Sequence, residues 1–418
     1  MSADFPAPAT AAAAVADAHR REWAFVLAAT VRVTRDIDLA EECVQEAYAQ
    51  ALTVWAKQGV PARPGGWLTT VARNRALDLL RHSAVQRRAL PLLIEDDRAD
   101  DIAEQAVAAG EPRITDDRLR LICTCCHPAL APEAQVALTL RLVCGLSTAE
   151  VARAFLISES TMAARITRAK KKIATARIPY RVPTPAELPE RIGAVLAVVH
   201  LLFTTGHTAP YGAELARREL TERAIDLARM LYGLVPGLAE VPGLLALLLL
   251  TESRRAARLD AGHAMVALAD QDRSAWNREL IAEGLALVPH SLRRPGKYAL
   301  QAAIAALHAE APSYDATDWR QIVGLYDELA RVWPSPVVAL NRAVALGYAE
   351  GPEPALAALD ELMAHPLLAT YEYLPAARAH FLAELGRTDE ARAAYDEAIL
   401  LTGNDIEREF VARKREAL

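Results

Sequence analysis

Residues 147–173, STAEVARAFLISESTMAARITRAKKKI, restrict the fold of this chain more than any other segment. They predict two short amphipathic helices joined by a tight turn. The first covers residues 148–155, and the second begins after Ser158, whose hydroxyl can cap a helix N-terminus. A basic second helix after such a turn suits the major groove of DNA, with an ordinary hairpin bearing a solvated basic face as the alternative. Apolar residues at helical spacing predict its buried stripe: Met162, Ile166, Ala169 and Ile173.

Composition indicates an all-α protein with two or three domains. The 418 residues are 52% hydrophobic but only 6% aromatic, and Ala and Leu dominate. This mixture favours helices, and no run of alternating Val, Ile and Thr indicates a sheet. Residues 1–179 carry 23 Lys and Arg against 21 Asp and Glu, whereas the remainder carries 24 against 32. The N-terminal part is therefore the better candidate for contacting a polyanion.

Cysteine usage and hydropathy favour a cytoplasmic protein. The five cysteines are odd in number and three are crowded together, unlike a secreted disulfide framework. The Ala-rich segment 10–16 lacks the basic residues that begin a signal peptide. The most apolar run, residues 241–250, is about half as long as a membrane span.

Shifts in composition divide the chain into helical domains and linkers. An acidic linker and a proline-rich connector, where each proline opposes helix continuation, separate the helical parts. A helical patch at residues 102–109 is expected within the linker. The expected divisions are a helical domain over residues 1–90 (helices near 18–34, 37–57 and 64–82), an acidic linker over 91–113, a helical domain over 114–178, a connector over 179–189 and a helical region over 190–418.

The C-terminal region contains a degenerate repeat. Residues 385–399 place Gly386, Ala391, Tyr395 and Ala398 at the offsets of the second helix of a tetratricopeptide unit. Tyr326 precedes Tyr395 by 69 residues, about two periods of ~34. A degenerate middle copy would lie near residues 355–362. Tetratricopeptide-like repeats are therefore expected from about residue 318, with a plain helical bundle as the alternative.

Two oppositely charged helices are predicted in the first domain. Residues 38–55 form an acidic amphipathic helix and residues 64–82 a basic one. Their outward-facing residues could simply be solvated, as they are on most amphipathic helices. The acidic outer face holds Glu41, Glu42, Gln45 and Glu46, and the basic one Arg73, Asn74, Asp78 and Arg81.

In their order, these motifs resemble the bacterial extracytoplasmic-function (ECF) sigma factors. That family has an A-E-D-x-x-Q-E-x-F-type helix followed by W-L-x-x-I-A-R-N-x-x-x-D-x-x-R, and this chain has AEECVQEAY and WLTTVARNRALDLLR. The family's region-four helix-turn-helix ends in R-x-x-R-A-[RK], and this chain has RITRAKKKI. The resemblance covers residues from about 18 to 177. The remaining tail resembles a subgroup with a C-terminal tetratricopeptide-like extension.

The resemblance implies partners for both domains. In region two, the acidic face of residues 38–55 would meet the β′ clamp of core RNA polymerase, with the β subunit as a further contact. The basic face of residues 64–82 would hold the promoter −10 element, since cations follow phosphates and amides read base edges. Trp67 is expected to pack rather than to stack on a base.

In region four, the second helix would read the −35 element. Leu156 departs from the glycine that many helix-turn-helix turns carry, and it would be strained if the turn needs a positive φ. Lys170 and Lys171 are expected to be phosphate contacts or solvated charges. The residues expected to contact −35 DNA are Glu159, Ser160, Thr161, Ala163, Arg165, Arg168 and Lys172.

No catalytic constellation, phosphate-binding glycine loop or cofactor motif is found. Cys123, Cys125, Cys126 and His127 could suggest zinc, but a structural site usually draws ligand pairs from separate segments. We therefore expect no metal and interpret these cysteines as small apolar residues at helix interfaces. The acidic linker is either a mimic of nucleic acid or a plain spacer.

These features predict an alternative sigma factor that binds core polymerase and promoter DNA and is not an enzyme. Two modules on a tether would raise each other's effective concentration. The tail would regulate the sigma unit in cis and bind a protein or peptide, for which small proteins of the DGPF type are conceivable. The alternatives are a helix-turn-helix regulator or repeat scaffold that acts without core polymerase, and an enzyme within the tail.

Overall fold

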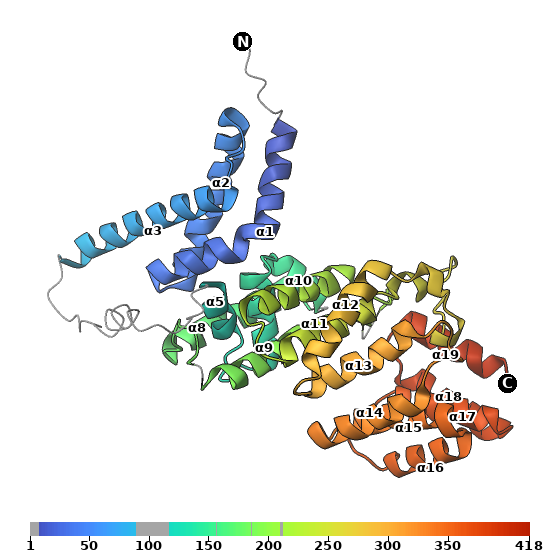
Figure 1. Cartoon of the computed structure of the whole chain (residues 1–418). Helices are drawn as coiled ribbons and strands as arrows, with labels where there is room; N and C mark the ends of the chain where they lie inside the picture. Colours follow the sequence, from blue (N-terminus) through green and yellow to red (C-terminus); the bar gives the residue numbers. More distant parts are fainter. Residues whose placement is uncertain (1–7, 89–116, 156, 185, 210–211) are drawn as a thin grey trace. The chain divides into compact units, whose positions relative to one another are not determined.

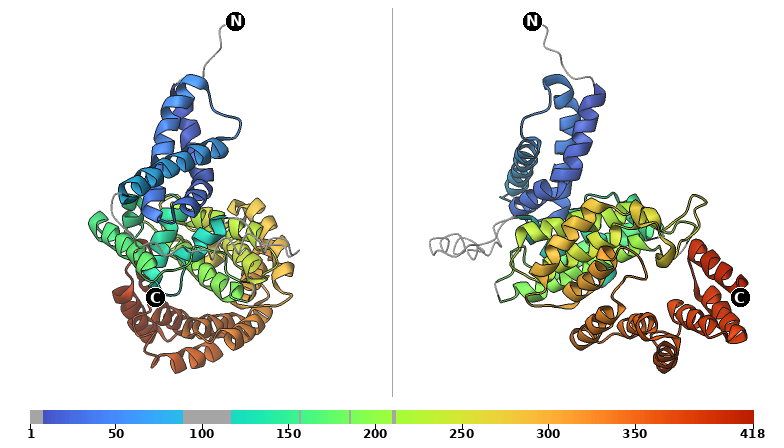
Figure 2. Two further views of the ribbon diagram at one scale, coloured as in Figure 1. Left: turned by 90° about the vertical axis from the view of Figure 1, so that its left-hand side faces the viewer. Right: turned by 45° about the vertical axis from the view of Figure 1, so that its right-hand side comes forward.

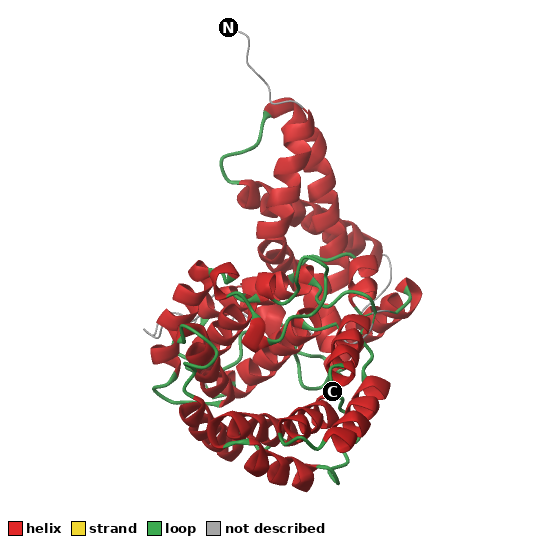
Figure 3. Ribbon diagram, turned by 90° about the vertical axis from the view of Figure 1, so that its right-hand side faces the viewer, coloured by secondary structure: helices red, strands yellow, loops and turns green. Residues whose placement is uncertain are grey.

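The computed structural model describes residues 8–88, 117–155, 157–184, 186–209 and 212–418. The chain divides into two compact units, residues 1–198 and 199–418, and each is described by itself. Among the described residues, secondary structure consists of helices and two isolated β-bridges, with no strand (Figure 3). The predicted all-α fold class is confirmed.

The first unit begins with three long helices, α1 (Pro8–Thr34), α2 (Ile37–Gln58) and α3 (Pro64–Arg88) (Figure 1). Each lies where a helix was predicted, although α1 begins earlier and α3 ends later than expected. Asp36 caps α2 because its carboxylate accepts hydrogen bonds from the backbone N–H groups of the first turn. Gly59 ends α2 at a φ of 83°, a conformation that favours glycine.

The second half of this unit holds the helix-turn-helix. It comprises α5 (Asp117–Cys125), α6 (Pro132–Leu138), the π-helix η2 (Thr139–Val143), α7 (Thr148–Ala154) and α8 (Glu159–Thr175).

The structure confirms how α8 was expected to begin and which of its faces is buried. The hydroxyl of Ser158 accepts a hydrogen bond from the N–H of Thr161 at 3.2 Å. The predicted stripe is fully buried on α8. Leu156 and the acidic linker over residues 91–113, including its expected helical patch, lie outside the described residues.

Helix α1 packs against the helix-turn-helix portion within the same unit. The indole Nε1 of Trp23 donates to the carbonyl of Leu142 at 3.0 Å, in a buried site. Gly145, at a φ of 72°, lies so close to this ring that a Cβ would sit 3.0 Å from it. The hydroxyl of Tyr180 donates to the carbonyl of Ala28 at 2.9 Å. These contacts join the two expected sigma domains into one packed unit.

Helix α9 (Leu188–His207) begins inside the expected proline-rich connector. Pro189 lies in its first turn, where a proline needs no backbone N–H, so the connector ends sooner than predicted. Of the described helices, α9 is long and apolar enough to cross a membrane by length and composition alone. One such helix is weak evidence, because the core helix of a soluble protein passes the same test.

The second unit continues with helices throughout. Helix α11 is buried on nearly every side, so the apolar run at residues 241–250 is a core helix. Gly243 allows close packing, since a Cβ there would lie 2.8 Å from the backbone nitrogen of Ala299. The elements are α10 (Arg218–Leu234), α11 (Glu240–Glu252), η3 (Arg255–Ala257), η4 (Leu268–Asp270), η5 (Arg273–Ala275), α12 (Arg278–Ser291), α13 (Lys297–Glu310), α14 (Trp319–Val332), α15 (Pro336–Glu350), α16 (Pro352–Leu362), α17 (Tyr373–Glu384), α18 (Thr388–Leu401) and α19 (Asp405–Glu416).

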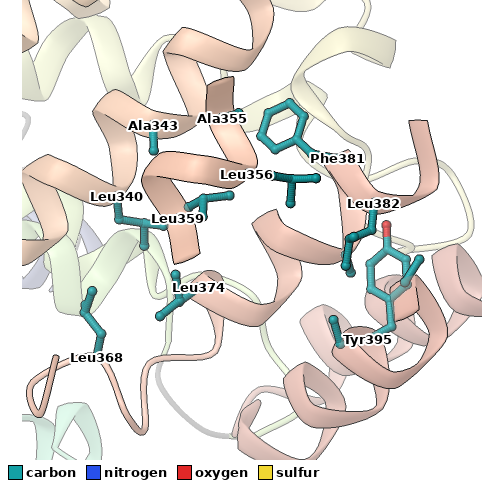
Figure 4. Close-up of a cluster of buried hydrophobic side chains, with 13 residues drawn as sticks. Leu340, Ala343, Ala355, Leu356, Leu359, Leu368, Leu374, Phe381, Leu382 and Tyr395 are labelled. Atoms are coloured by element: carbon teal, nitrogen blue, oxygen red, sulfur yellow. The ribbon is translucent and has the colours of Figure 1, made fainter. Parts of the chain in front are cut away.

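Helices α14, α16 and α18 carry the same inward pattern, with offsets of four and then three residues. The helices from α14 to α19 follow one another in a curved row (Figure 2). Apolar side chains of α15 to α18 meet in one core (Figure 4), and those of α14 pack with α13 and α15 in a second one. This agrees with the predicted phase of the repeat, and α16 supplies the expected middle copy. The three sets are Ile322, Tyr326 and Leu329; Ala355, Leu359 and Leu362; and Ala391, Tyr395 and Ala398.

Candidate nucleic-acid interface

The outer face of α8 is exposed, as a DNA-reading helix requires. The buried stripe faces the protein, and the N-terminal turn of α8 is open to solvent. There the Ser158 hydroxyl lies within hydrogen-bond distance of the hydroxyls of Ser160 (3.0 Å) and Thr161 (2.8 Å). The expected −35 residues lie together on this face. Glu159, Ser160, Thr161, Ala163, Arg168 and Lys172 are exposed, and Arg165 is half-buried.

The expected −10 residues are also accessible. Arg73, Asn74, Asp78 and Arg81 are all exposed on α3. Arg81 donates a hydrogen bond to Asp78 at 3.3 Å, one turn earlier on the same helix. This exposed pair contributes little to stability, so both side chains can rearrange toward a ligand.

Trp67 packs inside the three-helix part, as expected. Its ring meets the ring of buried Trp55 edge-to-face, with centroids 5.6 Å apart. Such a pair anchors α3 against α2. Trp67 therefore positions the exposed face of α3.

The acidic face of α2 differs from the expected one at Glu41. Glu42 and Gln45 are exposed, as predicted. Glu46 is half-buried and accepts a hydrogen bond from the Nε of Arg75 on α3 at 2.7 Å. Glu41 was expected on the outer face, but it is only 5% exposed, because residues of the helix-turn-helix portion cover it.

Four charged residues, Asp38, Glu41, Arg141 and Lys170, form a group that we call the Glu41 ion cluster, in which Asp38 is exposed and the other three side chains are largely buried. Lys170 Nζ contacts Asp38 Oδ1 at 2.7 Å and also donates to Glu41. The Nη2 of Arg141 lies 2.8 Å from Glu41 Oε1, but its N–H does not point at that oxygen, so the contact is electrostatic. Burial by itself would lower the pKa of Lys170, yet the hydrogen bonds to both carboxylates outweigh it and the pKa is raised. Lys170 is therefore charged and held inside the protein, which corrects the expectation of a solvated or phosphate-bound side chain.

Sequence reasoning did not find Arg141 or the partners of Lys170. Arg141 lies in η2, 100 residues from Glu41, and its Nη1 also donates to the carbonyl of Leu146 at 3.2 Å. Helical periodicity reports which face of one helix is apolar, but not which distant charge will cover it. The only local signal was that Lys170 is next to Ala169 of the buried stripe.

The cysteine cluster lies in the core around α5. Cys123, Cys125 and Cys126 are buried, and burial raises the pKa of the Cys123 thiol to about 11 and that of Cys126 to about 12. These shifts oppose the thiolate form that both zinc binding and oxidation need. In the described part of the chain, no group of three or more His, Cys, Asp or Glu side chains is placed to hold a metal. The packing thus supports the interpretation of these cysteines as core residues.

Three parts of the chain match known families. Residues 18–86 match sigma-70 region 2 and residues 121–173 match sigma-70 region 4. Residues 191–292 match a family of unknown function, DUF6596. These matches and the helical fold define a protein of the sigma-70 class.

The chain is similar to an uncharacterized protein and to a probable sigma factor. An uncharacterized protein of Rhizobium meliloti (strain 1021) is 45% identical over 391 residues, which is 92% of this chain and 91% of the relative. The probable ECF RNA polymerase sigma factor SigI, found in two strains of Mycobacterium tuberculosis, is 30% identical over 164 residues. That alignment spans 39% of this chain and 56% of SigI. No solved structure matches the chain.

The chain belongs to the ECF-type sigma factors and carries a C-terminal helical extension. It is an alternative sigma factor for promoter recognition, and sigma-factor families are not enzymes. Its sigma-70 region 2 and region 4 domains support interaction with core RNA polymerase and promoter DNA.

Proposed function

We propose that α8 reads the promoter −35 element through its first two turns. The observation that carries this proposal is that Glu159, Ser160, Thr161 and Ala163 lie exposed beyond a fully buried stripe on the same helix. Side chains at the start of a recognition helix reach base edges in the major groove. Arg165, Arg168 and Lys172 lie farther along, where they contact phosphate or guanine.

The exposed face of α3 holds the −10 element. Arg73 and Arg81 supply cations for the phosphates, and Asn74 supplies an amide for a base edge. Asp78 pairs only weakly with Arg81, so Arg81 is available to a phosphate when DNA binds.

The acidic face of α2 binds the β′ clamp of core polymerase, with β as a further contact. Glu42 and Gln45 are exposed and can meet a partner directly. Glu41 can do so only after Arg141 and Lys170 have moved away from it. Polymerase binding at Glu41 therefore requires that the Glu41 ion cluster opens.

In-vitro transcription with purified core polymerase tests this function. The full-length chain should direct specific initiation from core enzyme alone. The absence of a specific transcript would overturn the proposal, because a conventional repressor, or a scaffold that needs no polymerase, would give this result.

Matched variants separate the proposed surfaces. Glu42→Lys should weaken capture of core polymerase, whereas Glu133→Lys, on the exposed surface of α6, should not. Ser160→Ala should weaken protection of the −35 region in footprinting and leave polymerase capture intact. Equal effects of the two lysine variants on capture would contradict the α2 assignment.

The C-terminal helices regulate the sigma unit in cis and bind a protein or peptide, with DGPF-type proteins as candidates. Support comes from the recurrent inward pattern on α14, α16 and α18, since stacked helical repeats present surfaces suited to such ligands. The protein acts in the cytoplasm, where sigma factors meet polymerase. Deleting the residues after 189 tests the regulatory role, because promoter activity and specificity that stay unchanged in cells would contradict it.

A further inference from the structure

A cavity of about 240 Å³ lies within the second unit, at the start of the repeat helices. Helices α11, α13 and α14 and the segment between η4 and α12 contribute to its wall. It is somewhat smaller than the roughly 300–1,000 Å³ of sites for drug-sized ligands. The lining residues used below are Leu250, Arg254, Trp276, Ile304, His308 and Tyr326.

Arg254 is a cation in this wall with no acidic partner. In the part of the chain that the structure describes, no carboxylate lies within ion-pair distance of it, and its side chain makes no hydrogen bond. Neighbouring arginines differ: Arg255 pairs with Glu252 at 2.6 Å, and Arg273 donates to the carbonyls of His308 and Ala311. No Asp or Glu lines the cavity. This is unusual in a region that carries more acidic than basic residues.

Two further polar groups at the cavity lack partners. The Nε1 of Trp276 and the Nδ1 of His308 are buried, and neither has a hydrogen-bond partner among the described residues. Buried polar atoms normally have a hydrogen-bond partner, because leaving one unpaired destabilises the folded protein. Their presence next to an unpaired arginine indicates a site whose ligand completes the hydrogen bonding.

Apart from Thr251 and Gln301, the rest of the wall is apolar or aromatic. Leu250 and Ile304 are buried at the cavity, and Tyr326 adds an aromatic ring from α14. A ligand that fills the cavity must therefore combine one anionic group with an apolar or aromatic body. Arginine recognises a carboxylate through two parallel hydrogen bonds, which suits a small aromatic acid.

We propose that this cavity binds a small carboxylate with an aromatic body, whose carboxylate pairs with Arg254 while its ring packs against Leu250, Ile304 and Tyr326. The site does not depend on the polymerase contacts proposed above. A carboxylate bound here would touch α11, α13 and α14 together, so its occupancy would stiffen the start of the repeat helices.

Phenylacetate serves as the probe, and the uncharged phenylacetamide, which has the same ring, serves as its control. In saturation-transfer NMR with the full-length chain, phenylacetate should show transfer and a measurable Kd, and phenylacetamide should bind at least tenfold more weakly. Arg254→Met should weaken phenylacetate binding at least tenfold, and Arg254→Lys should restore part of it. Arg293→Met, which removes an exposed arginine from the same unit, should bind like the wild type.

Ligand-free stability gives a second readout. A partly buried cation without a partner is costly, so Arg254→Met should raise the melting temperature by about 2–4 °C. Gained stability together with lost binding supports the site. Equal binding of acid and amide, undiminished binding by Arg254→Met, or no binding of phenylacetate at millimolar concentration would each overturn the proposal.

Discussion

Neutralising the Glu41 ion cluster should loosen the packing of α1 and α2 against the helix-turn-helix portion. The variants are Glu41→Gln, Lys170→Gln and the double variant, each of similar size to the wild-type side chain. Lys171→Gln is the matched control, because Lys171 lies next to Lys170 on α8 but is exposed. Since Glu41 and Lys170 contact each other inside the protein, their effects should not be additive.

The magnitude follows from burial and distance. The side chains of Glu41, Lys170 and Arg141 are 6%, 14% and 17% exposed. Two opposite charges in contact attract by about 5 kcal/mol at an effective dielectric constant of ~20. Desolvation costs several kcal/mol per ion and offsets much of this attraction, and Arg141 remains beside Glu41 when Lys170 is neutralised. We therefore expect a coupling free energy of about 2 kcal/mol, similar to that of other close charge pairs.

Hydrogen exchange of the Trp23 indole measures this opening. Its Nε1–H donates to the carbonyl of Leu142 in a buried site, so it exchanges with deuterium only when the packing of α1 against η2 opens. Loss of one NMR signal in Trp23→Phe assigns the resonance.

Each single variant should exchange about 30-fold faster, since ~1.4 kcal/mol is tenfold in an equilibrium constant. The double variant should be little faster than either single one, and Lys171→Gln should match the wild type. Additive single effects, with a coupling free energy below about 0.5 kcal/mol, would show that Glu41 and Lys170 do not stabilise this packing together.

Three further outcomes are expected. Ser158→Ala removes the cap of α8 and should lower its stability by about 1 kcal/mol; reduced protection of its first-turn amides in hydrogen exchange would show this, and unchanged protection would contradict it. Gly347→Val should destabilise the second unit by at least about 1–3 kcal/mol in thermal unfolding, because even a Cβ at this position would lie 2.2 Å from the ring of Phe381; Gly233→Val, at a position with open space, is the control for the steric effect. Burial lowers the pKa of His200 to about 4 and that of His207 to about 2, so both stay neutral in the folded protein while the unfolded chain takes up protons below its pKa of about 6.5. The free energy of unfolding therefore keeps its full value above that pH and decreases below it, by about 1–2 kcal/mol per histidine between pH 7 and 5. Melting temperatures of His207→Gln that fall with decreasing pH as steeply as those of the wild type would argue against this.

Local sequence was sufficient for most of the helices and for their apolar faces, but not for the charged residues that become buried beside those faces. Ser158 begins α8 because its hydroxyl meets an N–H three residues away, and the buried stripe of α8 follows from the helical period alone. Helical periodicity also predicted where α2 and α3 lie. The repeat spacing predicted that Tyr326 and Tyr395 occupy equivalent positions. Pro189 was the local misjudgement, since a proline opposes the interior of a helix but not its first turn.

The all-α class, the sigma-factor motifs and the exposed faces of α3 and α8 could thus be predicted from the order of residues alone. The burial of Glu41 by Arg141 and Lys170, and the place of Arg254 in a cavity without an acidic partner, became visible only in the folded chain. The difference lies in the distance along the chain over which each effect acts. Capping and periodicity act over one or two helical turns, whereas the environment of a charge depends on residues brought together from distant positions along the chain.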